Sequence, residues 1–409
     1  MVIKGAMICD ANREQRGDIR IESGKITKVG LNILPLSGEE VLTAEGLVLM
    51  PTAIDLNVRV QDNLLNKENL LKLSRKAAKG GVGLAILMPD SKHLLNTEMG
   101  MDIINTLNND FSAKIFGAAG IKNHESDLAQ SQLPPLSILH KKGAAGIYLQ
   151  SSENGNLIHK ACEFSLMFDT PVFFDCEDTS LNMGGVMNDG ELAFKLGLPG
   201  ISSLSQIKEV AMLSELACFM NLKAIFNAIS SYRSLEILQN AKKRNPNIFT
   251  QVSIHHLLLT EMLCSHYNTA AKIKPPLKSE KTRIKLVKSI KAMEIDLITS
   301  LQSEVSLIYK DLPFEEAGFG VDMIEYFVPM CYTLLVKDER MTLKEMSKIL
   351  SLNPAKVLKV DNTKGLITEG YDADLLLLDT KKSQIIDIPN SPFYDWVFHG
   401  KIKQIFIGG

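Results

Sequence analysis

Apolar and polar side chains alternate strictly between residues 54 and 61. A β-strand sends successive side chains to opposite faces, so the polar set lines one surface. An amphipathic helix ending in Gly80-Gly81 and a second apolar strand, Val82 to Met88, follow this segment. Strand, helix and strand in this order begin a parallel α/β fold, in which ligands collect at the carboxyl ends of the strands. We therefore expect a site that includes the polar side chains Asn57, Arg59 and Gln61.

The same pattern recurs through the middle of the chain. Eight apolar strand candidates are each followed by a helical pattern or a polar loop, and they lie at 54–60, 82–88, 114–119, 144–149, 171–176, 222–227, 248–253 and 295–300. Eight strand–helix repeats over roughly 250 residues predict a (β/α)8 TIM barrel rather than an open sheet. The intervening helices include 68–79, 155–168, 205–220, 233–244 and 280–292. Two further helices are expected at 322–336 and 343–350, the second stopping at Asn353-Pro354.

Both ends of the chain have a different pattern, of short strands separated by Gly, Asp and Pro. The strand candidates are 2–4, 6–9, 18–21 and 25–29 near the start, and 373–378, 383–386 and 396–407 near the end. We predict a small discontinuous β-sandwich domain built from residues 1–49 and 360–409. The barrel with its C-terminal helices then takes residues 50–359.

Composition narrows the class of protein. Hydrophobic residues at 45% and charged residues at 22% are ordinary for a soluble globular chain of 409 residues. A formal charge of −2 argues against a nucleic-acid surface or a polybasic membrane patch. No basic N-terminal region precedes an apolar run, and no apolar stretch reaches about 20 residues, so neither secretion nor membrane spanning is expected. Six scattered cysteines without Cys-x-x-Cys are typical of reduced thiols in a cytoplasmic protein.

Ordered motifs run along the chain almost from end to end. They include Met50-Pro51-x-x-Ile54-Asp55, Lys79-Gly80-Gly81, Leu87-Met88-Pro89, Cys176-Glu177-Asp178, Gly185-Val186-Met187-Asn188-Asp189-Gly190, His255-His256-Leu257, Lys274-Pro275-Pro276-Leu277-Lys278, Asn353-Pro354-Ala355-Lys356 and Asp372-Ala373-Asp374. Through these motifs the chain resembles type I dihydroorotases of the cyclic amidohydrolase superfamily. The resemblance implies a barrel with one or two zinc ions at its C-terminal mouth. There a metal-bound hydroxide attacks the ring amide of dihydroorotate and an Asp moves the proton.

The positions that the resemblance assigns to metal ligands carry other residues. The His-x-His of the first strand is replaced by Asn57 and Arg59, and two later histidines by Asp175 and Ala228. The proton-moving Asp is replaced by Leu301. An amide is a poor zinc ligand, and a guanidinium has no lone pair to give. None of the eight histidines occupies a ligand position, so we predict that the protein holds no zinc and no other cofactor.

The positions for substrate recognition have changed as well. The Arg that follows His-x-His is Gln61, and two Asn positions are Asp90 and Lys274. We expect Arg59 and Asp175 to form an ion pair in the space left by the metals, because a buried charge is costly unless paired. The resemblance implies a metal-bridging carboxylate near Ser152-Glu153-Asn154, and Glu153 is the candidate for it. In the Cys176-Glu177-Asp178 motif, we expect the two carboxylates to have supporting or helix-capping roles and the cysteine to point away from the mouth. For Lys274 we expect an ion pair or solvation.

Three functions remain open from the sequence. The first is a catalytically inactive dihydroorotase-like protein of de novo pyrimidine biosynthesis, a homo-oligomer, expected to be a dimer, that serves as a structural subunit for the catalytic subunit of aspartate transcarbamoylase. The second is an active cyclic amidohydrolase converting dihydroorotate to N-carbamoyl-L-aspartate at an atypical site of Glu153, Asp175 and Glu177, where carboxylates favour Mg²⁺ or Mn²⁺. The third is a sensor that binds an anionic metabolite through Arg59 and Lys274.

Overall fold

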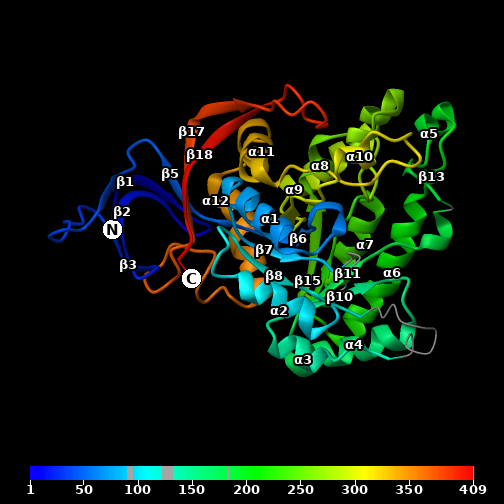
Figure 1. Cartoon of the computed structure of the whole chain (residues 1–409), viewed down its shortest axis with the longest axis horizontal. Helices are drawn as coiled ribbons and strands as arrows, with labels where there is room; N and C mark the ends of the chain where they lie inside the picture. Colours follow the sequence, from blue (N-terminus) through cyan, green and yellow to red (C-terminus); the bar gives the residue numbers. More distant parts are fainter. Residues whose placement is uncertain (90–94, 122–131, 183, 409) are drawn as a thin grey trace.

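The middle of the chain forms a barrel of parallel strands, and its two ends form a separate β-sheet beside the barrel (Figure 1). The computed structural model describes residues 1–89, 95–121, 132–182 and 184–408. Within these stretches, no helix combines the length and the apolar character needed to cross a lipid bilayer.

The barrel contains all eight strands that the sequence predicts. They are β6 (Ala53–Val58), β7 (Val82–Leu87), β8 (Lys114–Gly117) with its continuation β9 (Ala119–Gly120), β10 (Ile147–Gln150), β11 (Val172–Asp175), β14 (Ala224–Phe226), β15 (Ile248–Ser253) and β16 (Leu297–Thr299). Hydrogen bonds join them in the orders β6-β7-β8 and β16-β15-β14-β11-β10-β9. The ring closes after β16, where the Arg59 amide donates to the carbonyl oxygen of Gln302 at 2.7 Å. The barrel part of the predicted fold class is therefore confirmed.

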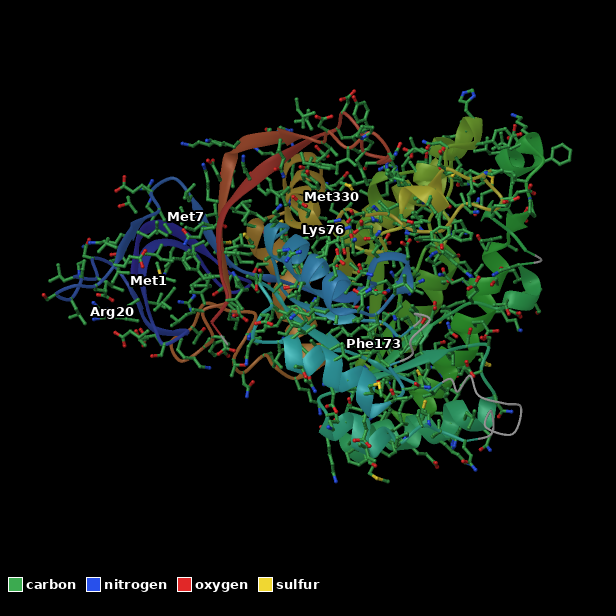
Figure 2. The ribbon with its side chains drawn as sticks, in the orientation of Figure 1. Met1, Met7, Arg20, Lys76, Phe173 and Met330 are labelled. Atoms are coloured by element: carbon green, nitrogen blue, oxygen red, sulfur yellow. The ribbon has the colours of Figure 1, made fainter. Side chains whose placement is uncertain are left out.

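Helices cover the outside of the barrel and bury one face each against it. In α1, Leu70, Leu73 and Ala77 recur at helical spacing and are buried, while the N-cap Asn66 accepts a hydrogen bond from the amide of Asn69 at 2.9 Å. The main covering helices are α1 (Lys67–Lys79), α2 (Glu98–Leu107), α3 (Leu136–Lys141), α4 (Gly155–Phe168), α6 (Ser203–Met220), α7 (Tyr232–Lys242) and α9 (Glu280–Lys291). Inside the ring of strands, apolar side chains form a buried cluster. Phe173 of β11 is one of its fully buried members (Figure 2).

The sheet at the chain ends combines strands from both termini in the order β18-β17-β5-β1-β2-β3, with β4 paired to β1. Its strands are β1 (Val2–Cys9), β2 (Glu14–Glu22), β3 (Lys25–Gly30), β4 (Val41–Thr43), β5 (Val48–Pro51), β17 (Leu375–Ile385) and β18 (Val397–Phe406). The predicted segments 2–4 and 6–9 form one strand, because Gly5 with φ of 73° accommodates a shift of register between them. The β-rich domain built from both termini is confirmed.

The helices after the barrel differ from the prediction at Asn353-Pro354. The first predicted helix is divided into η6 (Ile324–Tyr326), α11 (Phe327–Cys331) and the π-helical η7 (Tyr332–Asp338), and the second into α12 (Leu343–Ser347), the π-helical η8 (Lys348–Leu352) and α13 (Asn353–Leu358). The expected stop is therefore wrong, since the chain stays helical to Leu358. Pro354 lies in the first turn of α13, where a missing N–H does little harm.

Short elements complete the loops at the mouth of the barrel. They are η1 (Gln61–Asn63), η3 (Thr179–Leu181), β12 (Met187–Asn188), α5 (Glu191–Leu196), β13 (Gly200–Ile201), α8 (Ile254–Leu258), η4 (Glu261–Tyr267), η5 (Thr269–Ala271) and α10 (Leu307–Lys310). None of these short elements was among the predicted ones.

Candidate functional site

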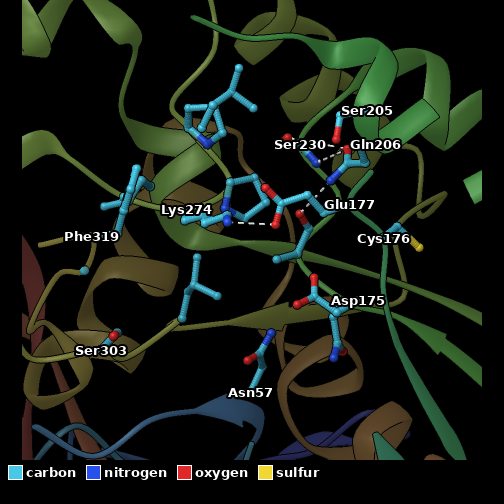
Figure 3. Close-up of a pocket in the computed structure, with 18 of the residues that line it drawn as sticks. Asn57, Asp175, Cys176, Glu177, Ser205, Gln206, Ser230, Lys274, Ser303 and Phe319 are labelled. Carbon is cyan, nitrogen blue, oxygen red and sulfur yellow. Dashed lines mark hydrogen bonds and ion pairs between the residues drawn. The ribbon is translucent and has the colours of Figure 1, made fainter. Parts of the chain in front are cut away.

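A cavity of about 220 Å³ opens where the barrel strands end (Figure 3). Strand ends supply its deeper wall, and the loop around Lys274 and the first turn of α6 supply other walls. This is the edge at which parallel α/β folds bind ligands. The lining includes Asn57, Arg59, Gln150, Asp175, Cys176, Glu177, Ser203, Asn227, Ala228, Lys274, Lys278 and Leu301.

The structure brings together six of the eight site positions predicted from the sequence, namely Asn57, Arg59, Asp175, Ala228, Lys274 and Leu301. Gln61 is not part of the lining, so the expectation that it touches a ligand is wrong. Its side-chain oxygen instead accepts a hydrogen bond from Lys72 Nζ at 2.8 Å, because the chain turns into η1 at this residue. Asp90 lies outside the described residues.

The carboxylate proposed at Glu153 is also absent from the cavity lining. Strand β10 ends at Gln150, and this neutral amide lines the cavity instead. Beyond it, the Ser151 hydroxyl accepts from the Glu177 amide at 2.9 Å, which fixes the turn beside β11.

A chain of hydrogen bonds occupies the end of β6. Arg59 Nη1 donates to Asn57 Oδ1 at 2.9 Å, and Asn57 Nδ2 donates to Gln251 Oε1 at 3.2 Å. Asn57 is 1% exposed and Gln251 is fully buried on β15. Gln251 was not among the residues predicted for the site, although a large polar residue in a predicted buried strand was an available signal. The two positions of the implied His-x-His are thus engaged with each other and with Gln251.

Arg59 and Asp175 both line the cavity, yet the ion pairs between described residues do not include the predicted pair of these two side chains. The Asp175 carboxylate accepts a hydrogen bond from the Tyr148 hydroxyl at 2.6 Å. Asp175 therefore has a neutral hydrogen-bonding partner in the Tyr148 hydroxyl, and Arg59 has one in the Asn57 amide.

Lys274 and Glu177 form an ion pair at the cavity, with Nζ 2.8 Å from Oε2 (Figure 3). The expectation that Lys274 is ion-paired is confirmed. Asp178 caps η3, since its Oδ1 accepts from the Ser180 amide at 2.9 Å. Hydrogen bonding from Lys208 and Ser180 lowers the pKa of the Asp178 carboxyl to about 2. The capping role expected for this residue is confirmed.

The sulfur of Cys176 points away from the middle of the cavity (Figure 3). Burial raises the pKa of this thiol well above its usual value, and the negative charges of Asp175 and Glu209 raise it further. The thiolate is the nucleophilic form of cysteine, so Cys176 is unsuited to nucleophilic catalysis.

The backbone is strained at two of the degenerate positions. Ala228 has φ of 45° and Leu301 has φ of 48°, in the left-handed region that costs a non-glycine residue about 1–2 kcal/mol. They follow β14 and β16, where the resemblance implies a histidine and an aspartate. Strain of this kind collects at functional sites, where the surrounding structure holds it in place.

The residues at this site do not fit the zinc that the resemblance implies. Across the described parts of the chain, no group of three or more His, Cys, Asp and Glu side chains is arranged to hold a metal ion. The former ligand positions offer an amide, a guanidinium, a methyl group and one carboxylate, whereas catalytic zinc takes three nitrogen, oxygen or sulfur ligands from protein side chains.

A parallel barrel with its site at the strand ends and a β-domain from both termini defines an amidohydrolase-like protein, and comparison with known sequences agrees. The sequence model of the Amidohydrolase family matches residues 236–409. The dihydroorotase of Elusimicrobium minutum is 30% identical over 426 residues, covering 100% of this chain and 96% of the relative. The dihydroorotase of Acetivibrio thermocellus is 28% identical over 422 residues, covering 100% and 98%. The chain therefore belongs to the amidohydrolase family, as a homologue of dihydroorotases.

A probable dihydroorotase-like protein of Helicobacter pylori is 27% identical over 409 residues, covering 100% of this chain and 97% of the relative. Among solved structures, the L-hydantoinase of Arthrobacter aurescens superposes with a TM-score of 0.86 at 18% identity, covering 100% of this chain and 94% of that one. The inactive dihydroorotase-like domain of the Chaetomium thermophilum CAD-like multifunctional protein gives 0.62 at 13% identity, covering 88% and 93%. These likenesses support the predicted fold.

Proposed function

We propose that this protein is a dihydroorotase-like component of pyrimidine biosynthesis that does not open the dihydroorotate ring. In this proposal it acts as a structural subunit for the catalytic subunit of aspartate transcarbamoylase. The observation that carries the proposal is the hydrogen-bonded chain of Arg59, Asn57 and Gln251 at the end of β6.

Electrostatics make this chain incompatible with a divalent ion in the same place. A guanidinium stays protonated in proteins, so Arg59 is a permanent cation. At a separation of about 4 Å and an effective dielectric constant of about 20, a single and a double positive charge repel by about 8 kcal/mol. The four histidine ligands and the proton-moving aspartate that the resemblance implies are not present at their positions either. In this proposal the protein therefore has no metal-bound hydroxide with which to open the dihydroorotate ring.

The backbone strain at Ala228 and Leu301 supports loss of chemistry with retention of the fold. Neither side chain can bind a metal or move a proton, yet both strand ends keep the costly left-handed conformation. The turn motifs Gly80-Gly81 and Pro275-Pro276, which are part of the resemblance, are present as well. Packing has thus been preserved where the ligands have not.

An active enzyme with an atypical metal site is the second candidate. Two of its three expected carboxylates, Asp175 and Glu177, do line the cavity. They are held by Tyr148 and Lys274, and Glu153 is not part of the lining. The candidate sensor that binds an anion through Arg59 and Lys274 meets a similar objection, since the Glu177 carboxylate already pairs with Lys274.

The proposal is tested by assembly with aspartate transcarbamoylase from the same organism. The two purified proteins, alone and mixed at micromolar concentration, are separated by size exclusion with light scattering, and carbamoyl transfer is assayed in each fraction. We expect a homodimer of this chain alone, a mixed complex of fixed ratio, and higher transferase activity or heat resistance in that complex. Separate elution with unchanged transferase activity would contradict the proposed assembly role.

A further inference from the structure

Lys278 lines the same cavity and takes no part in the hydrogen-bonded chain at the end of β6. Its side chain is 6% exposed, and its ammonium group donates to Asn188 Oδ1 at 2.8 Å and to Ser203 Oγ at 3.1 Å. An ammonium group has three N–H donors, and the described residues supply acceptors for two of them. Both acceptors are neutral. Lys278 is therefore a buried cation that donates to no carboxylate among the described residues, although the charges of Glu261 and Asp189 act on it from a distance.

The start of helix α6, beside Lys278, favours negative charge. Ser202 is the N-cap of α6, an 18-residue helix, and Ser203 is its first residue. The N-terminus of a helix carries a partial positive charge and amide donors, which attract anions. Among the described lining residues, the cations are Arg59, Lys274 and Lys278, against the carboxylates Asp175 and Glu177. Glu177 pairs with Lys274, and the carboxylates of Glu261 and Asp189 act on Lys278 without a hydrogen bond to it.

A second unsatisfied group lines the cavity at the end of β14. Asn227 is 3% exposed, and its amide oxygen has no hydrogen-bond partner among the described residues. Buried polar atoms are almost always hydrogen-bonded in proteins. An acceptor left open beside a cavity is available to a molecule that brings an N–H or O–H donor.

We propose that this cavity binds a small anion, with its carboxylate or phosphate group held by Lys278 and the first turn of α6, and with a donor group of the same molecule bonded to Asn227. The cavity volume of about 220 Å³ limits the ligand to a small metabolite. The inference goes beyond the proposed function, because it requires neither the loss of catalysis nor an assembly partner. It also differs from the anion site at Arg59 and Lys274 considered above, because it uses another cation.

Calorimetric titration with three probes tests the site and distinguishes the two anionic groups. The probes are L-malate, which has a hydroxyl donor, succinate, which lacks it, and inorganic phosphate. We expect malate to bind more tightly than succinate if the anionic group is a carboxylate, and phosphate to bind most tightly otherwise. The variant Lys278→Met should lose roughly tenfold to a hundredfold in affinity, the range for one charged hydrogen bond. The matched control Lys281→Met, at an exposed lysine on α9, should bind like the parent protein.

Lysine labelling of the unmodified protein gives a readout that does not depend on the folding of a variant. Burial lowers the pKa of Lys278 to about 8, so a fraction of this amine is neutral and acylated at pH 8. A saturating probe should protect Lys278 but not Lys281 from acetic anhydride, as measured by peptide mass spectrometry. Anion affinity should also fall as the pH rises above 8, because the ammonium loses its charge. The absence of binding by all three probes at 10 mM, or equal labelling of Lys278 with and without a bound probe, would overturn the proposal.

Discussion

The amide pair of Asn57 and Gln251 can be tested by a double-mutant cycle. Asn57→Leu and Gln251→Met keep the approximate size of each side chain and remove its hydrogen-bonding groups. Both residues are almost completely buried, and Asn57 Nδ2 lies 3.2 Å from Gln251 Oε1. Each single substitution therefore leaves a buried polar atom of the partner without its bond.

The cost follows from which groups remain unpaired. A buried donor or acceptor left without a partner costs about 1–3 kcal/mol, whereas replacing both partners by apolar groups is nearly neutral. Asn57→Leu also removes the acceptor of Arg59 Nη1. We therefore expect each single variant to lose about 1–3 kcal/mol of the free energy of unfolding. The double variant should lose less than the sum of the two, with a coupling energy of about 1–3 kcal/mol.

Urea unfolding followed by far-ultraviolet circular dichroism measures all four proteins of this cycle. The midpoints and slopes give the free energies, and equal slopes exclude a change in the unfolded state. A conservative exchange at an apolar site in the separate sheet of the chain ends, Ile19→Val, serves as the control for general loss of packing. Strict additivity of the two single effects would show that the amides do not act as a pair, and would refute this account of the β6 end.

Two further predictions concern the parts of the fold that hold the cavity in place. Gly80→Ala should sharply reduce the yield of folded protein, because the added Cβ would lie 1.8 Å from the carbonyl oxygen of Ile324. The control Gly155→Ala, whose added Cβ would meet nothing within 4 Å, should fold normally. Equal yields of the two variants would contradict the prediction. Burial, helped by the charge of Lys278, lowers the pKa of His256 to about 4, below the value of about 6.5 in an unfolded chain. Neutral His256 therefore contributes stability above pH 6.5 that is lost as the pH falls from 6.5 toward 4, by up to about 3 kcal/mol. Chemical denaturation across this range should show a shallower decline for His256→Gln, and identical pH profiles would contradict the assignment.

The barrel was predictable because its strands are short, continuous apolar runs separated by amphipathic helices. That pattern depends only on burial, and the eight strands of the barrel follow it. The stop at Asn353-Pro354 was wrong because proline ends a helix only when its missing N–H and its ring matter, which they do not in a first turn. Local rules therefore fail where a π-helical turn joins two helical segments.

The candidate site was only partly predictable. Five positions were found because each carries a different residue type from the one that the resemblance implies there. The structure brings all five to one cavity, namely Asn57, Arg59, Asp175, Ala228 and Leu301. The contacts that these residues make run across the barrel, such as Asn57 with Gln251, and join residues far apart in the sequence.

The burial of Lys278 could not be predicted from the sequence either. Lys278 looks like any solvated lysine in the sequence, and only the packing of α6 and the Pro275-Pro276 loop shows that its ammonium group lies inside.

The central claim is that this cavity holds no catalytic metal, and metal analysis joined to a turnover assay tests it most directly. The protein is purified without chelator, dialysed against zinc and then against buffer, and analysed by mass spectrometry for zinc, manganese and magnesium, with the Elusimicrobium minutum dihydroorotase treated in parallel. We predict far less than one metal ion per chain and no conversion of dihydroorotate to N-carbamoyl-L-aspartate by this protein, while the relative, as a dihydroorotase, turns over in the same assay. One metal ion per chain together with ring opening by this protein would contradict the claim.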